Sequence, residues 1–243
     1  MHRIANPLEW VEKETEFPKE RGVLSLPELG RIIASEGKIG SEPRRDGQLS
    51  GPGKPDIAPH QYAAILLGAL CGLRAGEVRG LQFDDVDAEA GFIHIVHNWV
   101  DSEGLKKPKQ GSTRTVPAPE PVLKAIEVCR ALTRGPFIFY NLRRSDTPGR
   151  MVTLTAGFEK VLHALGISKE EKERRVLVFH GLRHLFVSLS RSSGVPDYVV
   201  QHLSGHKSTK MLENYSHVEN VIDFEAARTK MAETIRTAIA AGE

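Results

Sequence analysis

The apolar positions of the chain recur mostly with helical spacing. Ser25, with Glu28 three residues later and a proline in the first turn, forms a capping box that predicts a helix through about Ala34. Residues 60–73 are apolar nearly all round, which indicates a buried central helix. Further helices are expected at 120–132, 153–165, 181–193, 196–204, 208–214 and about 221–240.

One stretch, residues 92–117, departs from the helical spacing. Apolar and polar residues alternate loosely over 92–97, a turn is expected at 101–104, and extended structure resumes at 114–116. Residues 137–140 fit a short strand or a buried loop equally well. The expected fold class is therefore α+β, mostly α, with one small antiparallel β-sheet.

Length and composition favour one large domain. The chain has 243 residues, of which 40% are hydrophobic and 26% charged, as in an ordinary soluble globular protein. Residues 1–22 carry two prolines and mixed charge and are interpreted as an arm or linker, so the domain spans 23–243. Glycine, proline and serine are frequent at 36–58, which predicts a long loop within that domain. No leader or membrane-spanning apolar run stands out, so a cytoplasmic protein is expected.

The charge of the chain indicates nucleic-acid binding only if it is concentrated locally. A formal net charge of +2 is too small to indicate DNA binding by itself. Two basic stripes are candidates, and either fits a solvated face equally well. The first stripe consists of Lys106, Lys107, Lys109 and Arg114, and the second consists of Arg143, Arg144 and Arg150.

Cysteines and histidines give no clear metal signal. Cys71 and Cys129 each lie in an apolar helical pattern, as small core residues of a protein in a reducing compartment do. Two histidine pairs are spaced four apart, as helical metal ligands can be. These pairs are His180/His184 and His202/His206. Neither has a glutamate beside its first histidine or a cysteine nearby, so no metal site is expected.

The segment that begins at His180 carries the clearest candidate chemistry. A helix that starts there favours an anion through its free N–H groups and its dipole. Arg183, in the first turn, adds a planar fork suited to two phosphate oxygens. Gly205 and His206 open a turn, and Tyr215 follows nine residues after the histidine. A phosphate site with a tyrosine close by is indicated, although a tyrosine alone would most often be a core residue.

Four short motifs follow one another along the chain. They are GLRAGE at 72–77, Lys109 ahead of RTVP at 114–117, HGLRH at 180–184, and GH at 205–206 with Tyr215. Taken alone, Arg74 would be interpreted as an ordinary surface residue, and Lys109 would be interpreted as a solvated lysine of a hairpin. The order and spacing of the motifs resemble the tyrosine recombinase (phage integrase) family, from about Val23 to Val218. The resemblance implies the family's C-terminal catalytic domain, without the N-terminal core-binding domain.

That resemblance implies DNA strand transfer that needs neither metal nor ATP. Tyr215 would attack the scissile phosphate, forming a 3′-phosphotyrosyl link and releasing a 5′-hydroxyl. Arg74 and Arg183 would stabilise the negative charge that develops on the non-bridging oxygens. Lys109 would protonate the leaving oxygen.

The other motif residues take supporting roles by the same resemblance. His206 would donate a further hydrogen bond to the phosphate, and His180 would serve as general base or orienting group. Glu77 would fix Arg74 or His180. His184 would be a structural residue beside the site.

The basic hairpin leaves one choice open. Gln110 stands where many relatives have threonine, so Lys106 or Lys107 remains an alternative to Lys109 as the proton donor. Contacts to DNA are expected mainly at phosphates, which position a protein without specifying sequence. Lys106, Lys107 and Arg114 are the candidates for these contacts.

The expected partner is a double-stranded DNA recombination site, bound by a homotetramer with the possible help of accessory DNA-bending proteins. No cofactor and no membrane are involved in this interpretation. Integration or excision of a mobile element or prophage is expected, while a role as a chromosome-dimer resolvase stays open. The C-terminal helix would pack on its own domain or dock on an adjacent subunit.

Two other classes of protein fit parts of the sequence. Residues 195–215 can be drawn as a helix-turn-helix, which would suit a DNA-binding module without catalysis. The histidine pairs would suit a metal-dependent phosphoesterase. The combination of Arg74, Arg183 and Tyr215 favours the recombinase, because a regulator has no need of all three.

Overall fold

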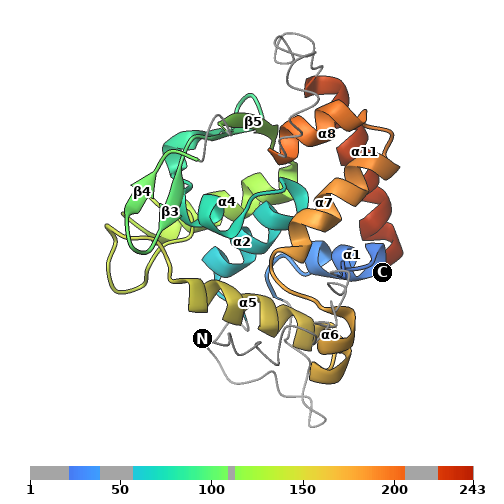
Figure 1. Cartoon of the computed structure of the whole chain (residues 1–243), viewed down its shortest axis with the longest axis horizontal. Coiled ribbons are helices and arrows are strands. Elements are labelled where there is room, and N and C mark those ends of the chain that lie inside the picture. Colours follow the sequence, from blue (N-terminus) through green and yellow to red (C-terminus); the bar gives the residue numbers. More distant parts are fainter. Residues whose placement is uncertain (1–21, 39–56, 109–112, 206–223, 243) are drawn as a thin grey trace, which may run out of the picture.

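The structure is a computed structural model that describes residues 22–38, 57–108, 113–205 and 224–242. Within these ranges, helices surround a central helix and two small antiparallel sheets lie to one side (Figure 1). The expected class, mostly helical α+β, is confirmed. Nearly all of the predicted arm at 1–22, most of the predicted loop at 36–58, and the helix predicted at 208–214 lie outside the described residues.

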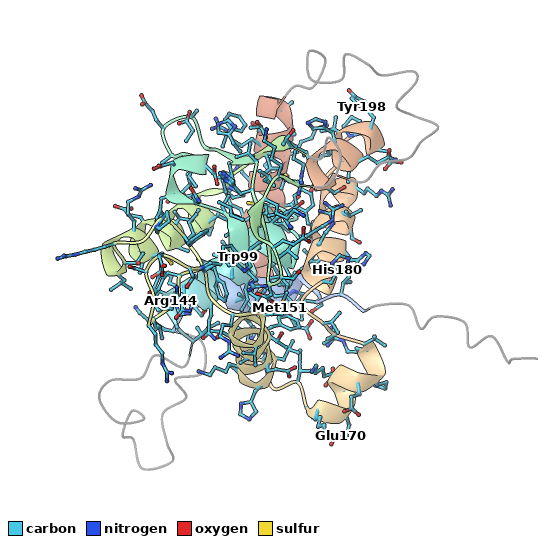
Figure 2. The ribbon with its side chains drawn as sticks, turned by 60° about the vertical axis from the view of Figure 1, so that its left-hand side comes forward. Trp99, Arg144, Met151, Glu170, His180 and Tyr198 are labelled. Carbon is cyan, nitrogen blue, oxygen red and sulfur yellow. The ribbon has the colours of Figure 1, made fainter. Side chains whose placement is uncertain are left out.

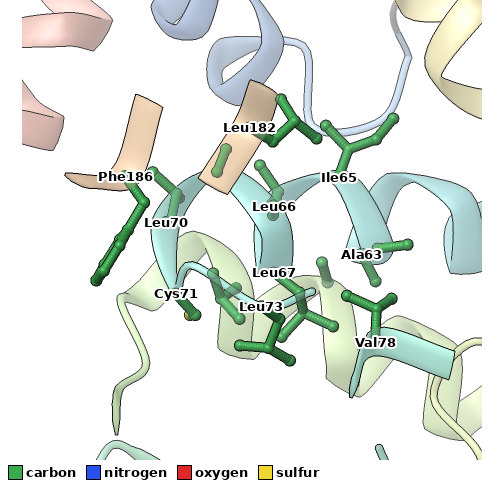
Figure 3. Packing of buried hydrophobic residues seen from close by; sticks show 14 of the residues in the cluster. Ala63, Ile65, Leu66, Leu67, Leu70, Cys71, Leu73, Val78, Leu182 and Phe186 are labelled. Atoms are coloured by element: carbon green, nitrogen blue, oxygen red, sulfur yellow. The ribbon is translucent and has the colours of Figure 1, made fainter. Parts of the chain in front are cut away.

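Helix α2 (Pro59–Leu70) is the central helix that the apolar run predicts. Every residue from His60 to Leu70 is buried, and apolar side chains crowd around the helix (Figure 3). It packs against α4 (Glu120–Leu132), α5 (Met151–Ala164) and α7 (Gly181–Ser192). Each buried leucine or isoleucine contributes about 1.5–3 kcal/mol relative to exposure, so this helix anchors the fold.

The first and last described helices pack against each other. Helix α1 (Leu26–Ala34) begins with the predicted capping box, because Glu28 N–H donates to Ser25 Oγ and Ser25 N–H donates to the Glu28 carboxylate. The C-terminal end of helix α11 (Phe224–Gly242) packs closely against it, since a Cβ on Gly30 would lie 1.9 Å from the carbonyl oxygen of Ala238. The buried apolar residues of α11 show that this helix packs on its own domain, which is the first of the two expected alternatives; they are Ala227, Met231, Ile235 and Ala238.

The predicted single sheet is wrong, since the strands form two sheets. The first has the order β1 (Val86–Asp87), β2 (Phe92–Ile95) and β5 (Arg114–Pro117), all antiparallel. The second is a hairpin of β3 (Asn98–Val100) and β4 (Gly104–Lys106), with its turn at the predicted place.

The hairpin separates from the first sheet because β3 packs instead on α3 (Ala75–Gly80). Two glycines of α3 make this approach possible. A Cβ on Gly80 would lie 2.9 Å from the backbone of Asn98, and one on Gly76 would lie 2.4 Å from the Asn98 side-chain oxygen. Arg79 fixes the hairpin further by pairing with Asp101 and by donating from Nε to Gly149 O at 3.0 Å.

Three further elements complete the described fold. They are the short 3-10 helix η1 (Phe83–Asp85), α6 (Lys169–Arg175) and α8 (Asp197–Ser204). The segment 137–140 is buried and makes isolated bridges, so it is the buried loop of the two alternatives. Cys71 and Cys129 are buried free thiols, as predicted. None of the helices in the described ranges is long and apolar enough to cross a membrane.

Candidate active site

The turn between α2 and α3 joins two of the predicted catalytic residues. Gly72 has a φ of +68°, and a Cβ there would lie 2.5 Å from the ring of Phe186. Its carbonyl oxygen accepts a hydrogen bond of 2.7 Å from Nη1 of Arg183 on α7. Arg74 follows two residues later as the first residue before α3. One glycine turn thus brings the two arginines, far apart in the sequence, to the same place.

Arg74 is held by Glu77 from its own helix. The Glu77 carboxylate accepts hydrogen bonds from Arg74 Nη1 at 2.9 Å and from the Arg74 backbone N–H at 2.8 Å. The other end of the guanidinium, Nη2, donates to Gly205 O at 2.9 Å. The Arg74 side chain is still 36% exposed, so it is fixed in place yet open to a ligand.

Glu77 is the shared carboxylate of two arginines. Arg114 pairs with it through both terminal nitrogens, at 3.0 and 2.9 Å, and donates from Nε to Leu203 O at 2.7 Å. Side-chain exposure in this pair is only 1% for the arginine and 2% for the glutamate. Although burial alone would raise it, the pKa of Glu77 is lowered by the hydrogen bonds and charge of Arg114, and by Arg74, so the carboxylate is ionised.

The sequence predicts Arg114 as an exposed residue that contacts DNA phosphates, but its side chain is buried. The basic stripe in the sequence placed it beside solvated lysines, whereas in the structure its guanidinium is buried and donates to Glu77 and to Leu203 O. A signal in the sequence could have shown this, because Arg114 and Val116 share one face of a strand by the two-residue period and valine prefers the buried face. Val116 is fully buried.

Arg183 is almost entirely buried, with 1% exposure. Apart from the bond to Gly72, its Nε and Nη2 have no hydrogen-bond partner among the described residues. Burial, and then the neighbouring guanidinium groups of Arg74 and Arg114, lower the pKa of Arg183 to about 9. The group therefore remains charged at neutral pH. A buried cation with two unused donors is suited to an anion.

His180 and His184 stand at the start of α7, where Figure 2 labels the first of them. Both are half-buried, and their rings meet edge to face with centroids 5.1 Å apart. Within the described ranges, no three His, Cys, Asp or Glu side chains gather closely enough to hold a metal ion. The pair thus lies beside Arg183 as imidazoles able to exchange or donate a proton.

The lysines of the hairpin lie on the surface. Lys106 and Lys107 are exposed on or beside β4, and Lys106 pairs with Glu103. The second predicted stripe, Arg143, Arg144 and Arg150, is exposed as well. Lys109, His206 and Tyr215 lie outside the described residues, so their predicted roles stay predictions.

The described part of the site is a cluster of positive charge. Three arginines and one carboxylate meet between the α2–α3 turn, β5 and the end of α8, and β5 and α8 lie side by side in Figure 1. One carboxylate against three guanidinium groups leaves an excess of two positive charges. The arrangement can bind a doubly or singly charged anion such as a phosphate and stabilise further charge that develops on it.

Comparison with known proteins agrees with this geometry. The sequence profile described as the phage integrase family matches residues 54–221. The chain belongs to the phage integrase family. That match covers all four motifs of the site, from Gly72 to Tyr215.

Relatives in this family include named recombinases. The tyrosine recombinase XerA of Pyrococcus furiosus is 27% identical over 167 residues, which cover 68% of this chain and 52% of XerA. The tyrosine recombinase XerD of Proteus mirabilis is 27% identical over 205 residues, covering 81% of this chain and 59% of XerD. The chain thus spans about half the length of the curated relatives it matches first.

Solved structures share the fold. A Tn1549 transposon integrase in complex with transposon right end DNA matches with a TM-score of 0.60 at 22% identity, over 93% of this chain and 69% of that one. The structure of XerA recombinase matches with a TM-score of 0.56 at 20% identity, over 96% of this chain and 69% of that one.

Proposed function

We propose that this chain is the catalytic domain of a site-specific tyrosine recombinase, which cleaves and rejoins double-stranded DNA without metal or ATP. One observation carries the proposal. Arg183 is buried, with two donors that have no partner among the described residues, beside Arg74, which is fixed by Glu77 and partly exposed. Such a pair is suited to the two non-bridging oxygens of one phosphate.

Cleavage needs a nucleophile that conserves the energy of the phosphodiester bond. Tyr215 attacks phosphorus, the P–O5′ bond breaks, and the 3′-phosphate stays bonded to the tyrosine oxygen. Lys109 supplies a proton to the leaving 5′-oxygen, and His180 accepts the proton of the phenol or orients it. The reverse attack by a 5′-hydroxyl rejoins the strand.

Arg74, Arg183 and His206 act on the phosphate itself. The transition state places more negative charge on the non-bridging oxygens than the ground state does, so donors fixed beforehand stabilise it selectively. Removal of one such donor typically costs a factor of about 10²–10³ in rate. Glu77 contributes by holding Arg74, and Lys106 and Lys107 contact the DNA backbone.

The biological role we propose is movement of a mobile element or prophage. The Tn1549 integrase, whose fold this chain shares, is bound to transposon DNA in its structure. A homotetramer on DNA, working in the bacterial cytoplasm with accessory DNA-bending proteins, completes the proposal.

The test uses a nicked DNA substrate that loses its 5′-hydroxyl strand on cleavage and so traps the covalent intermediate. We expect a protein–DNA adduct on a denaturing gel with the wild type in EDTA, and no adduct with Tyr215→Phe. An adduct that Tyr215→Phe still forms would contradict the assignment of the nucleophile. DNA binding without any adduct, also after addition of a core-binding domain, would favour the non-catalytic module.

A further inference from the structure

Arg114 joins the parts of the site that bind the phosphate. Its Nη1 and Nη2 hold Glu77, whose carboxylate in turn holds the side chain and backbone of Arg74. Its Nε holds Leu203 O at 2.7 Å. One side chain on β5 therefore contacts both the α3 side and the α8 side of the cluster.

The end of α8 is shaped to accept two guanidinium groups. Its last carbonyl groups carry partial negative charge because the helix dipole ends there. Leu203 O accepts from Arg114, and Gly205 O accepts from Arg74. Gly205 has a φ of +62°, and a Cβ on it would lie 3.0 Å from Arg114 Nη1 and 3.4 Å from Arg74 Nη1. The glycine leaves room for both groups side by side.

The charge balance gives Arg114 a second effect. Without Arg114, the full charge of Glu77 would fall on Arg74 alone, and the Arg74 guanidinium would compete less well for a phosphate. With Arg114 bound in a two-bond fork, the carboxylate is shared, and Arg74 keeps charge to offer to a ligand. A lysine cannot reproduce this, because a single ammonium cannot make the fork and the bond to Leu203 O together.

We propose that Arg114 is a positioning residue for DNA cleavage, which acts through Glu77 on Arg74 and never contacts the phosphate. The inference rests on the proposed function, since it concerns the same reaction. It assigns to a buried strand residue a role in orienting the phosphate clamp, that is, the pair Arg74 and Arg183.

Arg79 provides a matched control in the same chain. It is also buried, at 3% exposure, pairs with a carboxylate through both terminal nitrogens, and donates from Nε to a backbone carbonyl. Its partners, Asp101 and Gly149, belong to the hairpin side of the fold and not to the clamp. Arg79→Lys thus removes the same kind of contacts without touching Arg74.

The first experiment compares two trapping substrates in single-turnover reactions. One has a normal scissile phosphate, and the other a methylphosphonate, which lacks one non-bridging charge. For Arg114→Lys we expect cleavage of the phosphodiester to fall about 30-fold, as for a weakened electrostatic contact, and cleavage of the methylphosphonate to fall less than about threefold. Arg79→Lys should lower both rates by the same factor. An equal loss on both substrates for Arg114→Lys would overturn the proposal.

The double variant Glu77→Gln/Arg114→Gln covers the case in which Arg114→Lys does not fold. It removes both charges of the pair together, so neither Glu77 nor Arg114 is left as a buried charge without its partner. We expect the same selective loss on the phosphodiester, because Arg74 has lost its carboxylate. Equal losses on the two substrates would again contradict the role of Arg114.

A second measurement needs no catalysis. In ¹⁵N spectra of the DNA-free protein, the guanidinium signals of Arg74, identified by their loss in Arg74→Lys, should shift or broaden in Arg114→Lys and stay in place in Arg79→Lys. Unchanged Arg74 signals in Arg114→Lys would overturn the inference. If the wild type forms no adduct with either substrate, also after addition of a core-binding domain, the proposed function fails, and these spectra still decide whether Arg114 positions Arg74.

Discussion

Arg74 and Arg183 carry the same group but are held in opposite ways. Arg74 is partly exposed, and its donors are taken by a carboxylate and a carbonyl. Arg183 is buried, donates to one carbonyl oxygen, and keeps two donors without a described partner. The first arrangement stabilises the fold and orients the group. The second costs stability, because a buried charge is only partly compensated.

This difference between the two arginines indicates which of them would contribute more to the free energy of phosphate binding. A phosphate that meets Arg183 satisfies donors that are already desolvated, so the interaction is strong and needs no further ordering of the side chain. A phosphate that meets Arg74 must share it with Glu77. We therefore propose that Arg183 would be the main phosphate-binding group of the pair and that Arg74 would be the adjustable one.

The largest effect is expected for Arg183→Met, which separates activity from stability. Cleavage of the trapping substrate should fall about 10³-fold. The free energy of unfolding in urea should stay the same or rise by about 1 kcal/mol, because an apolar side chain of similar volume replaces a poorly compensated charge. Arg74→Met should also lower cleavage, while stability falls by no more than about 1 kcal/mol. A clear loss of stability in Arg183→Met would contradict the comparison.

The next effect concerns the carboxylate that holds Arg74. Glu77→Gln leaves Arg114 buried without its counter-charge, so we expect a loss of about 3–5 kcal/mol in the free energy of unfolding. Glu77→Gln/Arg114→Gln should recover much of that loss, since both charges are then absent. Urea denaturation of the two variants checks this. If the double variant is as unstable as the single one, the charge pair is not the cause.

A smaller effect is expected at the turn that holds Arg183. Gly72→Ala forces a left-handed conformation and a contact of 2.5 Å with the Phe186 ring, so stability should fall by about 2–4 kcal/mol. Gly166→Ala is the control, because Gly166 has a φ of +81° with open space around it. Its cost should be about 1 kcal/mol, from the backbone alone. Equal thermal stability of the two variants would contradict a packed turn.

The smallest effect is expected from an ion pair away from the clamp. The hydrogen bond from Arg175 lowers the pKa of Glu28 from 4.5 to about 2. Because the folded pKa lies below the ordinary one, this pair stabilises the protein above pH 4.5 and ceases to do so as the pH falls toward 2. Glu28→Gln should flatten the pH dependence of unfolding in that range, by less than about 1 kcal/mol since the pair is partly solvated. An unchanged slope would mean that the pair contributes nothing.

Features that depend on neighbours in the sequence were predictable. The capping box of α1 involves Ser25 and Glu28 only, and the burial of α2 follows from its own apolar run. Helix α6 was not predicted, because none of its residues is buried and no apolar period marks it. It is held by the Ser168 cap and by contacts of Arg175 with Glu28 and Val23. Those partners lie far away in the sequence.

In the candidate active site, too, the contacts between residues distant in the sequence were the part that could not be predicted. The motifs predicted that Arg74, Glu77 and Arg183 belong together, and the structure brings them to one cluster. The burial of Arg114 was not predicted, because a basic run in a sequence is most often solvated. Its burial depends on a carboxylate 37 residues away and a carbonyl 89 residues away. The period shared with Val116 indicates the buried face of the strand, but no local pattern identifies these distant partners.

The packing of α1 against α11 has a consequence for how the protein is made. Nearly the whole described chain lies between these two helices, yet they share one close interface around Gly30. As the chain leaves the ribosome, α1 emerges before α11, and the surface of α1 that α11 will cover stays uncovered until α11 has been synthesised. Contacts between such distant segments slow folding and lengthen the time for which apolar surface is exposed. We therefore expect α11 to pack in a late folding step, after the other described elements of the domain have been synthesised.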